Sequence, residues 1–204
     1  MTWTTRTALI AMTLAATAPA HAGEGHATDP HAGHALPAHQ QVFGAEHLDV
    51  AETQVLDQDG RALSFRDDVL GDGPVILTFV YTSCTTVCPV ANAVFQTTEA
   101  ELDAMGDGGV RLISISVDPA RDTPDRLRAM AETFDAGPRW TLVTGRPADI
   151  SRLLRSFGLA IGALEDHDPM FLVRRGGEDS YVRVVGLPDA RTLVDLALGS
   201  EGHG

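Results

Sequence analysis

The feature that most constrains the fold is a continuous run of apolar and β-branched residues at 75–82, "VILTFVYT". A run of this length without polar alternation is typical of a central strand that is buried on both faces of its sheet. A second such run, "VRLISISVD", occupies 110–118, and a helical pattern fills 87–105 between the two. Strands that alternate with helices in this way predict an α/β fold with a partly parallel sheet.

The rest of the chain continues the alternation. Residues 50–65 contain two extended segments around a turn-type cluster at 57–60, which predicts an N-terminal β-hairpin. We expect further elements in this order: a helix at 123–134 capped by Thr123, a strand at 140–145, a helix at 147–158 ending at Gly158, strands at 169–175 and 181–186, and a helix at 188–199. The final hairpin makes the predicted sheet mixed, with helices flanking it.

The two cysteines of the chain, Cys84 and Cys88, follow the central strand directly and precede a proline. This is the edge at which open α/β sheets place their active sites. Three uses compete: a structural bridge, a redox couple and a metal site. A bridge across four positions would remove little chain entropy, so stability is a weak reason for it. The helix start at Cys88 predicts a lowered thiol pKa there.

A third metal ligand would have to come from elsewhere in the chain. His167, in "LEDHDPMFL", is the only histidine between residues 48 and 198. Two thiolates and one imidazole suit copper in either oxidation state, although zinc accepts the same ligands. Taken alone, His167 is better explained as a surface residue of an acidic loop, and only its combination with the cysteine loop makes it a candidate ligand. Met170, nearby on a strand, is expected in the core.

The first 22 residues predict a secretory signal peptide. Arg6 precedes an apolar run from Ala8 to Ala18, and "APAHA" offers a cleavage site before Gly23. The run is shorter than the roughly 20 residues that a membrane-spanning helix needs. We therefore expect export to the periplasm with cleavage, an uncleaved anchor being the alternative. The net charge of −13 repels nucleic acid and anionic lipid, so neither is an expected partner.

Residues 23–47 predict a flexible linker rich in alanine, glycine, proline and histidine. Its histidines could gather metal ions loosely or could simply be solvated, and composition does not decide between the two. They are His26, His31, His34, His39 and His47. The last residues, 199–204, predict a disordered tail.

Three motifs together resemble the Sco/SenC family: "CTTVCP" after a buried strand, "SVDPARDTP" at 116–124, and the downstream His167. The resemblance implies a thioredoxin-like copper-binding domain over residues 48–198, in an exported protein linked to cytochrome c oxidase assembly. It implies that Cys84 and Cys88 are copper thiolates and also a redox couple, and that His167 binds the copper.

The second of these motifs includes Asp118 and Pro119, to which we assign a turn-forming role rather than ligation. The chain departs from the family pattern in two places. Asp168 follows the histidine where a small hydroxyl residue is common, and the leader is expected to be cleaved where many members keep an anchor.

The leading hypothesis is a monomeric periplasmic copper metallochaperone that binds one Cu(I) or Cu(II). It would deliver the ion to the binuclear copper site of cytochrome c oxidase subunit II or a similar protein, and other periplasmic copper carriers are further candidate partners. The alternative is an enzyme, a thiol–disulfide oxidoreductase with Cys84 and Cys88 as catalytic residues. A peroxidase is a weaker third interpretation, because no feature points to peroxide.

Overall fold

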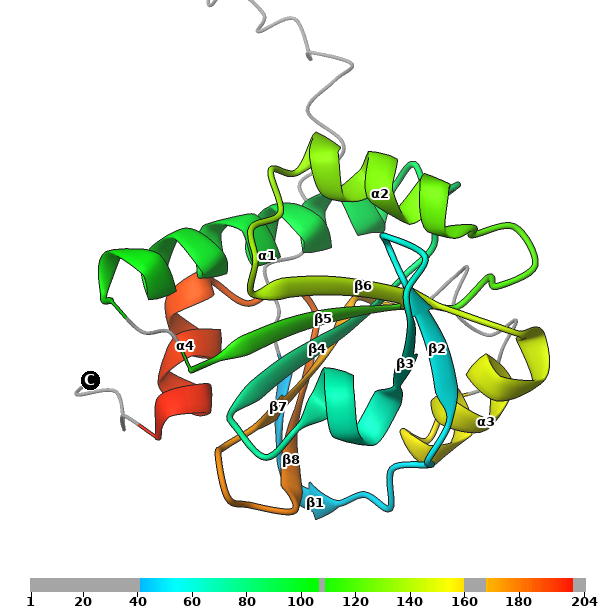
Figure 1. Ribbon diagram of the computed structural model, residues 1–204. Coiled ribbons are helices and arrows are strands. Elements are labelled where there is room, and N and C mark those ends of the chain that lie inside the picture. Colours follow the sequence, from blue (N-terminus) through cyan, green and yellow to red (C-terminus); the bar gives the residue numbers. More distant parts are fainter. Residues whose placement is uncertain (1–40, 107–108, 160–167, 200–204) are drawn as a thin grey trace, which may run out of the picture. The chain divides into compact units, whose positions relative to one another are not determined.

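The computed structural model describes residues 41–106, 109–159 and 168–199. These residues form an eight-stranded sheet in the order β1-β8-β7-β4-β5-β6-β2-β3 (Figure 1). The strands are β1 (Gln41–His47), β2 (Gln54–Asp57), β3 (Ala62–Ser64), β4 (Val75–Val80), β5 (Arg111–Ser116), β6 (Trp140–Thr144), β7 (Met170–Arg174) and β8 (Ser180–Val185). The helices are α1 (Val87–Ala104), α2 (Pro124–Thr133), α3 (Pro147–Ser156) and α4 (Ala190–Leu198), with a short π-type helix η1 (Phe65–Leu70).

The two continuous apolar runs form the centre of this sheet. β4 pairs in parallel with β5, from Val75 opposite Arg111 to Val80 opposite Ser116, and β5 pairs in parallel with β6. β7 lies antiparallel on the other side of β4. The predicted mixed sheet is therefore confirmed, and the predicted hairpin is present as β2 and β3. Because β4 has β7 on one side and β5 on the other, the loop that follows β4 begins in the middle of one edge of the sheet.

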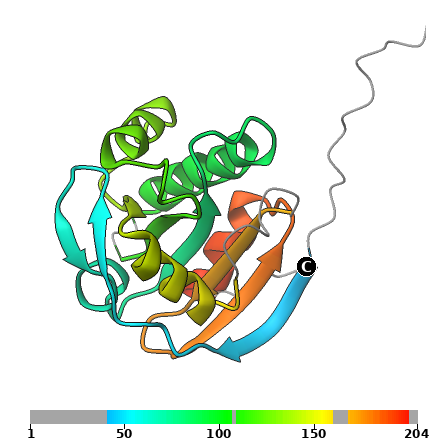
Figure 2. The ribbon, with the colours of Figure 1, turned by 90° about the vertical axis from the view of Figure 1, so that its right-hand side faces the viewer.

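Helices cover both faces of the sheet (Figures 1 and 2). On one face the buried side chains of α1, α2 and α4 form one apolar cluster with the strands, in which Phe95 stacks against Trp140 and Phe171 at centroid distances of 5.4 and 5.7 Å. On the other face η1 and α3 form a second cluster, where the Phe157 ring contacts Phe65 and Tyr181 edge-on. Burial of these aromatic rings contributes a large share of the hydrophobic stabilisation.

The helix boundaries follow the capping signals in the sequence. The Thr123 side chain accepts a hydrogen bond from the Arg126 amide, and Pro124 is the first helical residue of α2, as predicted. Asp189 caps α4 in the same way by accepting from the Thr192 amide. Gly158, which follows α3, has a φ of +74°, a conformation that glycine adopts without strain.

One stretch of the predicted linker was assigned wrongly. Residues 41–47 form strand β1, which pairs antiparallel with β8 at the edge of the sheet, as Figure 2 shows. Most of its residues are exposed, including Val42 and Phe43, so the segment carries no apolar alternation for sequence reasoning to detect. Its hydrogen bonds come from a partner strand more than 130 residues away. The predicted signal peptide, the remainder of the predicted linker and residues 200–204 lie outside the described residues.

Candidate functional site

The two cysteines lie where β4 gives way to α1. Cys84 is in the connecting loop, and its amide donates to the Tyr81 carbonyl at 3.2 Å. Cys88 is the second residue of α1. Both side chains are buried and both thiols are free. The loop therefore brings two reduced sulfur atoms to the carboxyl end of the central strand, as the sequence predicted.

The sulfur of Cys84 takes the place of a helix cap. Thr86 is the N-cap residue of α1, but its side chain makes no capping hydrogen bond. Instead, the backbone N–H of Cys88 donates to Cys84 Sγ at 3.3 Å. The Thr86 hydroxyl lies 3.8 Å from the same sulfur. The positive end of the α1 dipole and an otherwise unpaired amide thus act on Cys84.

This arrangement separates the two thiol pKa values. Burial opposes ionisation of Cys84, but hydrogen bonds from the Cys88 thiol and amide, and from Thr86 and Tyr81, outweigh it and lower the Cys84 pKa to about 7. Burial raises the pKa of Cys88 to about 12, helped by donation of its S–H to Cys84 and by the negative charges of Cys84 and Asp122. The sequence-based prediction of a lowered pKa at Cys88 is therefore wrong: the helix start stabilises the thiolate of Cys84.

A buried carboxylate fixes the loop that carries the cysteines. Asp122 is 1% exposed, and its Oδ1 accepts hydrogen bonds from the Thr82 amide at 3.1 Å and from the Thr82 hydroxyl at 2.5 Å. Its Oδ2 accepts from the Ser116 hydroxyl at 2.6 Å. Asp122 therefore ties the start of the cysteine loop to the end of β5. Asp122 was not predicted from the sequence, although it lies in "SVDPARDTP", because Asp118 was the aspartate of this motif that was given a role.

Asp118 has the structural role that was predicted for it. Its carbonyl accepts from the Asp122 amide at 2.8 Å, and its side chain forms an ion pair with Arg121. Met170 begins β7 and is buried, as predicted for a core residue, with its sulfur 2.7 Å from an Arg183 nitrogen. His167 lies outside the described residues. Its neighbour in the chain, Asp168, lines a small cavity together with Cys88.

A groove opens on the other flank of the cysteines, between α1 and α2. It has a volume of about 490 Å³ and is lined by Cys84 and Cys88 together with Thr82, Ser83, Pro89, Asn92, Arg126, Ala129, Met130, Thr133 and Phe134. The sulfur atoms are therefore placed at the edge of a hollow that a second molecule can enter. Sequence reasoning did not find this groove, because its two walls belong to helices about 40 positions apart.

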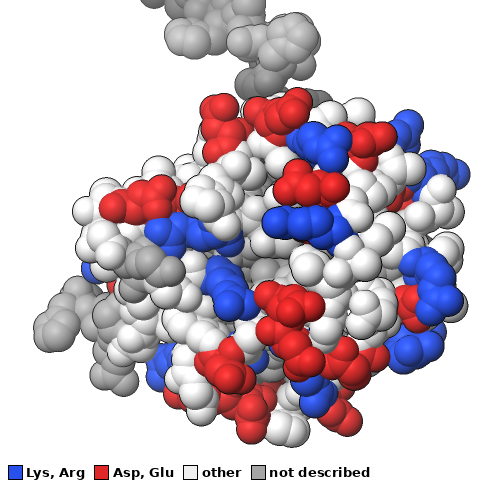
Figure 3. Space-filling view, in the orientation of Figure 1, with Lys and Arg blue, Asp and Glu red and all other residues white. Residues whose placement is uncertain are grey.

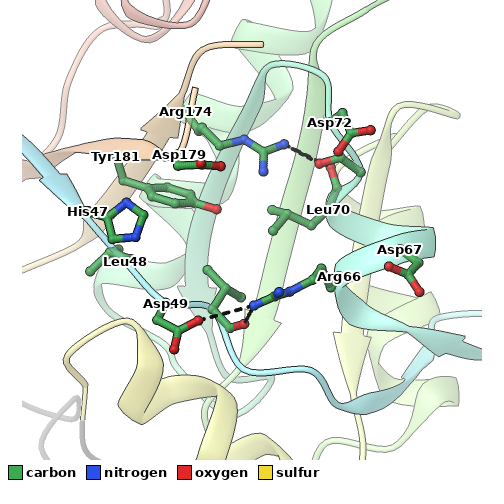
Figure 4. Close-up of a pocket in the computed structure, with 12 residues that line it drawn as sticks. His47, Leu48, Asp49, Arg66, Asp67, Leu70, Asp72, Arg174, Asp179 and Tyr181 are labelled. Carbon is green, nitrogen blue, oxygen red and sulfur yellow. Dashed lines mark hydrogen bonds and ion pairs between the residues drawn. The ribbon is translucent and has the colours of Figure 1, made fainter. Parts of the chain in front are cut away.

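A larger cavity, of about 630 Å³, lies at the opposite end of β4 (Figure 4). Arg174 and Arg66 reach into it from opposite sides, and His47 lies beside the Tyr181 ring. Arg174 donates to the carbonyl oxygens of Gly71 and Gly73, so it clamps the loop before β4. His47, one of the predicted linker histidines, is thus placed at the far end of the central strand from the cysteines.

The donor set near the groove is a pair of thiols. In residues 41–106, 109–159 and 168–199, no group of three histidine, cysteine, aspartate or glutamate side chains is arranged to hold a metal ion. Cys84 and Cys88 fit a soft metal ion because both sulfurs lie together and one ionises readily. A complete site needs a further ligand.

No helix in the described part of the chain combines the length and the apolarity that a bilayer span requires.

Comparison with known proteins places the chain in a family. The SCO1/SenC family model matches residues 47–173. A Stutzerimonas stutzeri protein to which copper binding has been ascribed is 27% identical over 179 residues, which are 88% of this chain and 82% of that protein.

Two solved structures share the fold. Bradyrhizobium japonicum ScoI with copper bound is 29% identical, with a TM-score of 0.55 over 72% of this chain and 96% of that one. BsSco, described as a member of the Sco family of cytochrome c oxidase assembly proteins, is 23% identical, with a TM-score of 0.62 over 75% of this chain and 94% of that one. The predicted thioredoxin-like fold is confirmed. With the family model covering the cysteine loop, the buried aspartate and the central strands, the chain belongs to the SCO1/SenC family.

Proposed function

We propose that this protein binds one copper ion through Cys84, Cys88 and His167 and transfers it to the binuclear copper site of cytochrome c oxidase subunit II or a similar acceptor. The observation that carries the proposal is the pair of buried thiols at the start of α1, of which Cys84 ionises near neutral pH. Soft thiolates are the ligands that retain copper, and a two-sulfur site with one imidazole can release it by ligand exchange.

The relatives support copper as the metal. Copper binding has been ascribed to the Stutzerimonas stutzeri relative, and the Bradyrhizobium japonicum protein was solved with copper bound. Family membership supports the class of acceptor, because BsSco belongs to a family of cytochrome c oxidase assembly proteins. Export to the periplasm with removal of residues 1–22 belongs to the same proposal, since the N-terminal sequence has the pattern of a signal peptide.

The thiol pKa values suggest an order of binding. At neutral pH Cys84 is already partly thiolate, so it is the first sulfur to hold the ion. Cys88 must lose its proton as it binds, which couples copper affinity to pH. A positive ion next to Cys88 would offset both the burial of its thiolate and the charge of Asp122. Release would follow the same order in reverse, with Cys88 reprotonated as the acceptor takes over.

His167 is proposed as the third ligand on the evidence of its neighbour. Asp168 lines a cavity with Cys88, and consecutive Cα atoms are about 3.8 Å apart. The chain therefore comes close to Cys88 one residue after His167. This supports convergence of the three side chains, with Asp168 as a carboxylate close to the ion.

Thiol–disulfide exchange is the second candidate, and the separation of the two pKa values favours it. Cys84 would attack a disulfide of the acceptor and form a mixed disulfide while one acceptor thiolate leaves. Cys88 would then attack Cys84 Sγ, releasing the second acceptor thiolate and leaving a Cys84–Cys88 disulfide. The acceptor is reduced by two electrons and this protein is oxidised by two. The reaction requires neither copper nor His167.

Anaerobic Cu(I) titration of the reduced protein tests the proposal. We expect one tightly bound ion, lost in Cys84→Ser and Cys88→Ser. Changes in outer-shell residues lower metal affinity about 10–100-fold, and His167→Ala should lower the Cu(I) affinity by more than that. His47→Ala is the matched control, because His47 lies at the other end of β4, and its affinity should be unchanged. Unchanged binding in all three ligand variants would refute the proposed site, whereas thiol exchange that persists in His167→Ala would support the second candidate.

A further inference from the structure

The groove between α1 and α2 contains a polar group without a partner. One face of α1 is buried along its length, at Cys88, Ala91, Asn92, Phe95, Thr98, Glu99 and Leu102. Asn92 is 1% exposed, and neither its Nδ2 nor its Oδ1 has a hydrogen-bond partner in the described part of the chain. The other buried polar side chains on this face have at least one partner: Thr98 donates to the Val94 carbonyl, and Glu99 accepts from the Gly137 amide through Oε2, although its Oε1 has no partner among the described residues. Of this face, Cys88 and Asn92 line the groove, and Asn92 lies one turn after the cysteine.

Buried polar groups in folded proteins are almost always hydrogen-bonded, so an unpaired carboxamide next to a reactive site points to an occupant. A carboxamide offers one acceptor and one donor side by side. The N–H and C=O of a polypeptide backbone present the complementary pair. Both Asn92 atoms are covered in the free protein, so an occupant reaches them through side-chain rearrangements of the kind that accompany most complexes. Met130, a flexible and half-buried neighbour in the groove, can provide this movement.

The charge of the groove lining indicates which kind of occupant would bind there. Acidic and arginine side chains are interspersed over the face drawn in Figure 3, and the chain as a whole carries a net charge of −13. Among the described residues that line the groove there is no aspartate or glutamate, and the one cationic side chain is Arg126. Arg126 is exposed and forms no ion pair with a carboxylate within the described ranges. Pro89, Met130 and Phe134 supply the apolar part of the lining.

We propose that this groove is the docking site for an extended segment of the acceptor protein, next to the acceptor's own thiols. A backbone amide of that segment pairs with the Asn92 carboxamide, an apolar side chain packs against Met130 and Phe134, and a carboxylate faces Arg126. The volume of about 490 Å³ is within the range of sites that enclose short peptides or drug-sized ligands. The proposal rests on the proposed function, since its occupant is the protein that exchanges a ligand or a disulfide with Cys84.

Two activated peptides test the docking site without any metal. Each carries one cysteine as its mixed disulfide with 5-thio-2-nitrobenzoate, flanked by leucine and glutamate in one peptide and by leucine and lysine in the other. In full-length Cys88→Ser protein, the Cys84 thiolate forms a bond to the peptide sulfur, the original S–S bond breaks, and the nitrobenzoate leaves as a coloured thiolate. We expect the acidic peptide to react about fivefold faster than the basic one, the size of an exposed ion pair acting on association.

Substitutions separate docking from general electrostatics. Arg126→Glu should abolish or reverse the preference for the acidic peptide, whereas Arg128→Glu, the same charge change on α2 outside the groove, should keep it. Asn92→Leu should slow both peptides and leave the reaction with neutral hydroxyethyl disulfide unchanged, which shows that Cys84 itself is intact. Circular dichroism and the thermal midpoint verify folding of each variant.

The stable adduct gives a second readout. In ¹H–¹⁵N spectra of the disulfide-linked complex, the amide signals of Arg126, Met130 and Phe134 should shift, while those of the cavity around Arg174 should not. Equal rates for the two peptides, an equal loss of preference in Arg128→Glu, or an adduct that leaves the α2 signals in place would each overturn the docking site. Because no copper is used, failure of the copper titration would leave this result intact, and failure here would leave the metal site standing.

Discussion

Cys84 Sγ accepts the backbone N–H of Cys88 at 3.3 Å, so the first cysteine caps the helix that carries the second. The same contact gives the two thiols different chemistry. Cys84 accepts hydrogen bonds from the Cys88 amide and thiol and lies at the positive end of the helix dipole, so its pKa is lowered. Cys88 is buried next to the negative charges of Cys84 and Asp122, so its pKa is raised. One sulfur is therefore available as a thiolate near neutral pH, and the other stays protonated until a metal ion or an oxidising partner arrives.

Alkylation of the reduced protein should follow this separation. With a Cys84 pKa of about 7 and a Cys88 pKa of about 12, limiting iodoacetamide at pH 7 to 8 should modify Cys84 first. The rate should rise with pH, because the thiolate is the reactive form, and should level off above the pKa of Cys84. Peptide mass spectrometry after a timed quench identifies the modified site. Preferential labelling of Cys88 would contradict the helix-cap arrangement.

Asp122→Asn should destabilise the protein and change the second thiol. The substitution removes a buried charge that accepts three hydrogen bonds, and losses of this kind cost about 1–3 kcal/mol. It also removes a negative charge that raises the Cys88 pKa, so that pKa should fall. Urea unfolding measures the first effect, and ultraviolet thiolate absorbance as a function of pH measures the second in a Cys84→Ser background.

Asp118→Asn provides the control for that experiment. Asp118 lies in the same motif, but its carboxylate forms an ion pair with an arginine that is 67% exposed. Such pairs contribute about 0–1 kcal/mol. The control should therefore change the free energy of unfolding little and leave the Cys88 pKa in place. Equal effects of the two substitutions would show that Asp122 is not the residue that fixes the loop.

Asn92→Leu should stabilise the protein while it impairs docking. A buried amide without a partner costs about 1–3 kcal/mol, and leucine has a similar size without polar atoms. We expect the free energy of unfolding from urea titration to rise by about that amount. Thr98→Val on the same face of α1 is the comparison, because Thr98 already donates to Val94, and it should give no gain. A loss of stability in Asn92→Leu would mean that the carboxamide has a partner in solution.

Oxidation should abolish copper binding at the cysteine site. A Cys84–Cys88 disulfide removes both sulfur ligands, so the oxidised protein should keep only the copper that the predicted linker holds. Replacing the linker histidines with alanine measures that remainder; they are His26, His31, His34 and His39. Equilibrium dialysis of oxidised and reduced protein gives the two stoichiometries. Equal stoichiometries in the two states would place the bound metal elsewhere than on the sulfurs.

The fold could be predicted from sequence wherever a signal was local. The apolar runs at 75–82 and 110–118 predicted β4 and β5, and Thr123 with Pro124 predicted the start of α2. Strand β1 could not be predicted in this way, because it is exposed and owes its structure to hydrogen bonds with β8. The helix η1 was also missed, since the six residues after the hairpin carry no recognisable helical period.

By itself, the sequence determined the order of the elements from β2 to α4 apart from η1, the position of both cysteines after a central strand and the resemblance that led to the family. Contacts across the fold decided the rest. They made Cys84 rather than Cys88 the more acidic thiol, brought Asp122 from the β5–α2 loop onto Thr82, and placed Arg126 across a groove from Asn92. The physical reason is the distance along the chain over which each effect acts. Propensity and spacing act over a few neighbouring residues, whereas hydrogen bonding, desolvation and groove formation depend on which distant segments the packed sheet brings together.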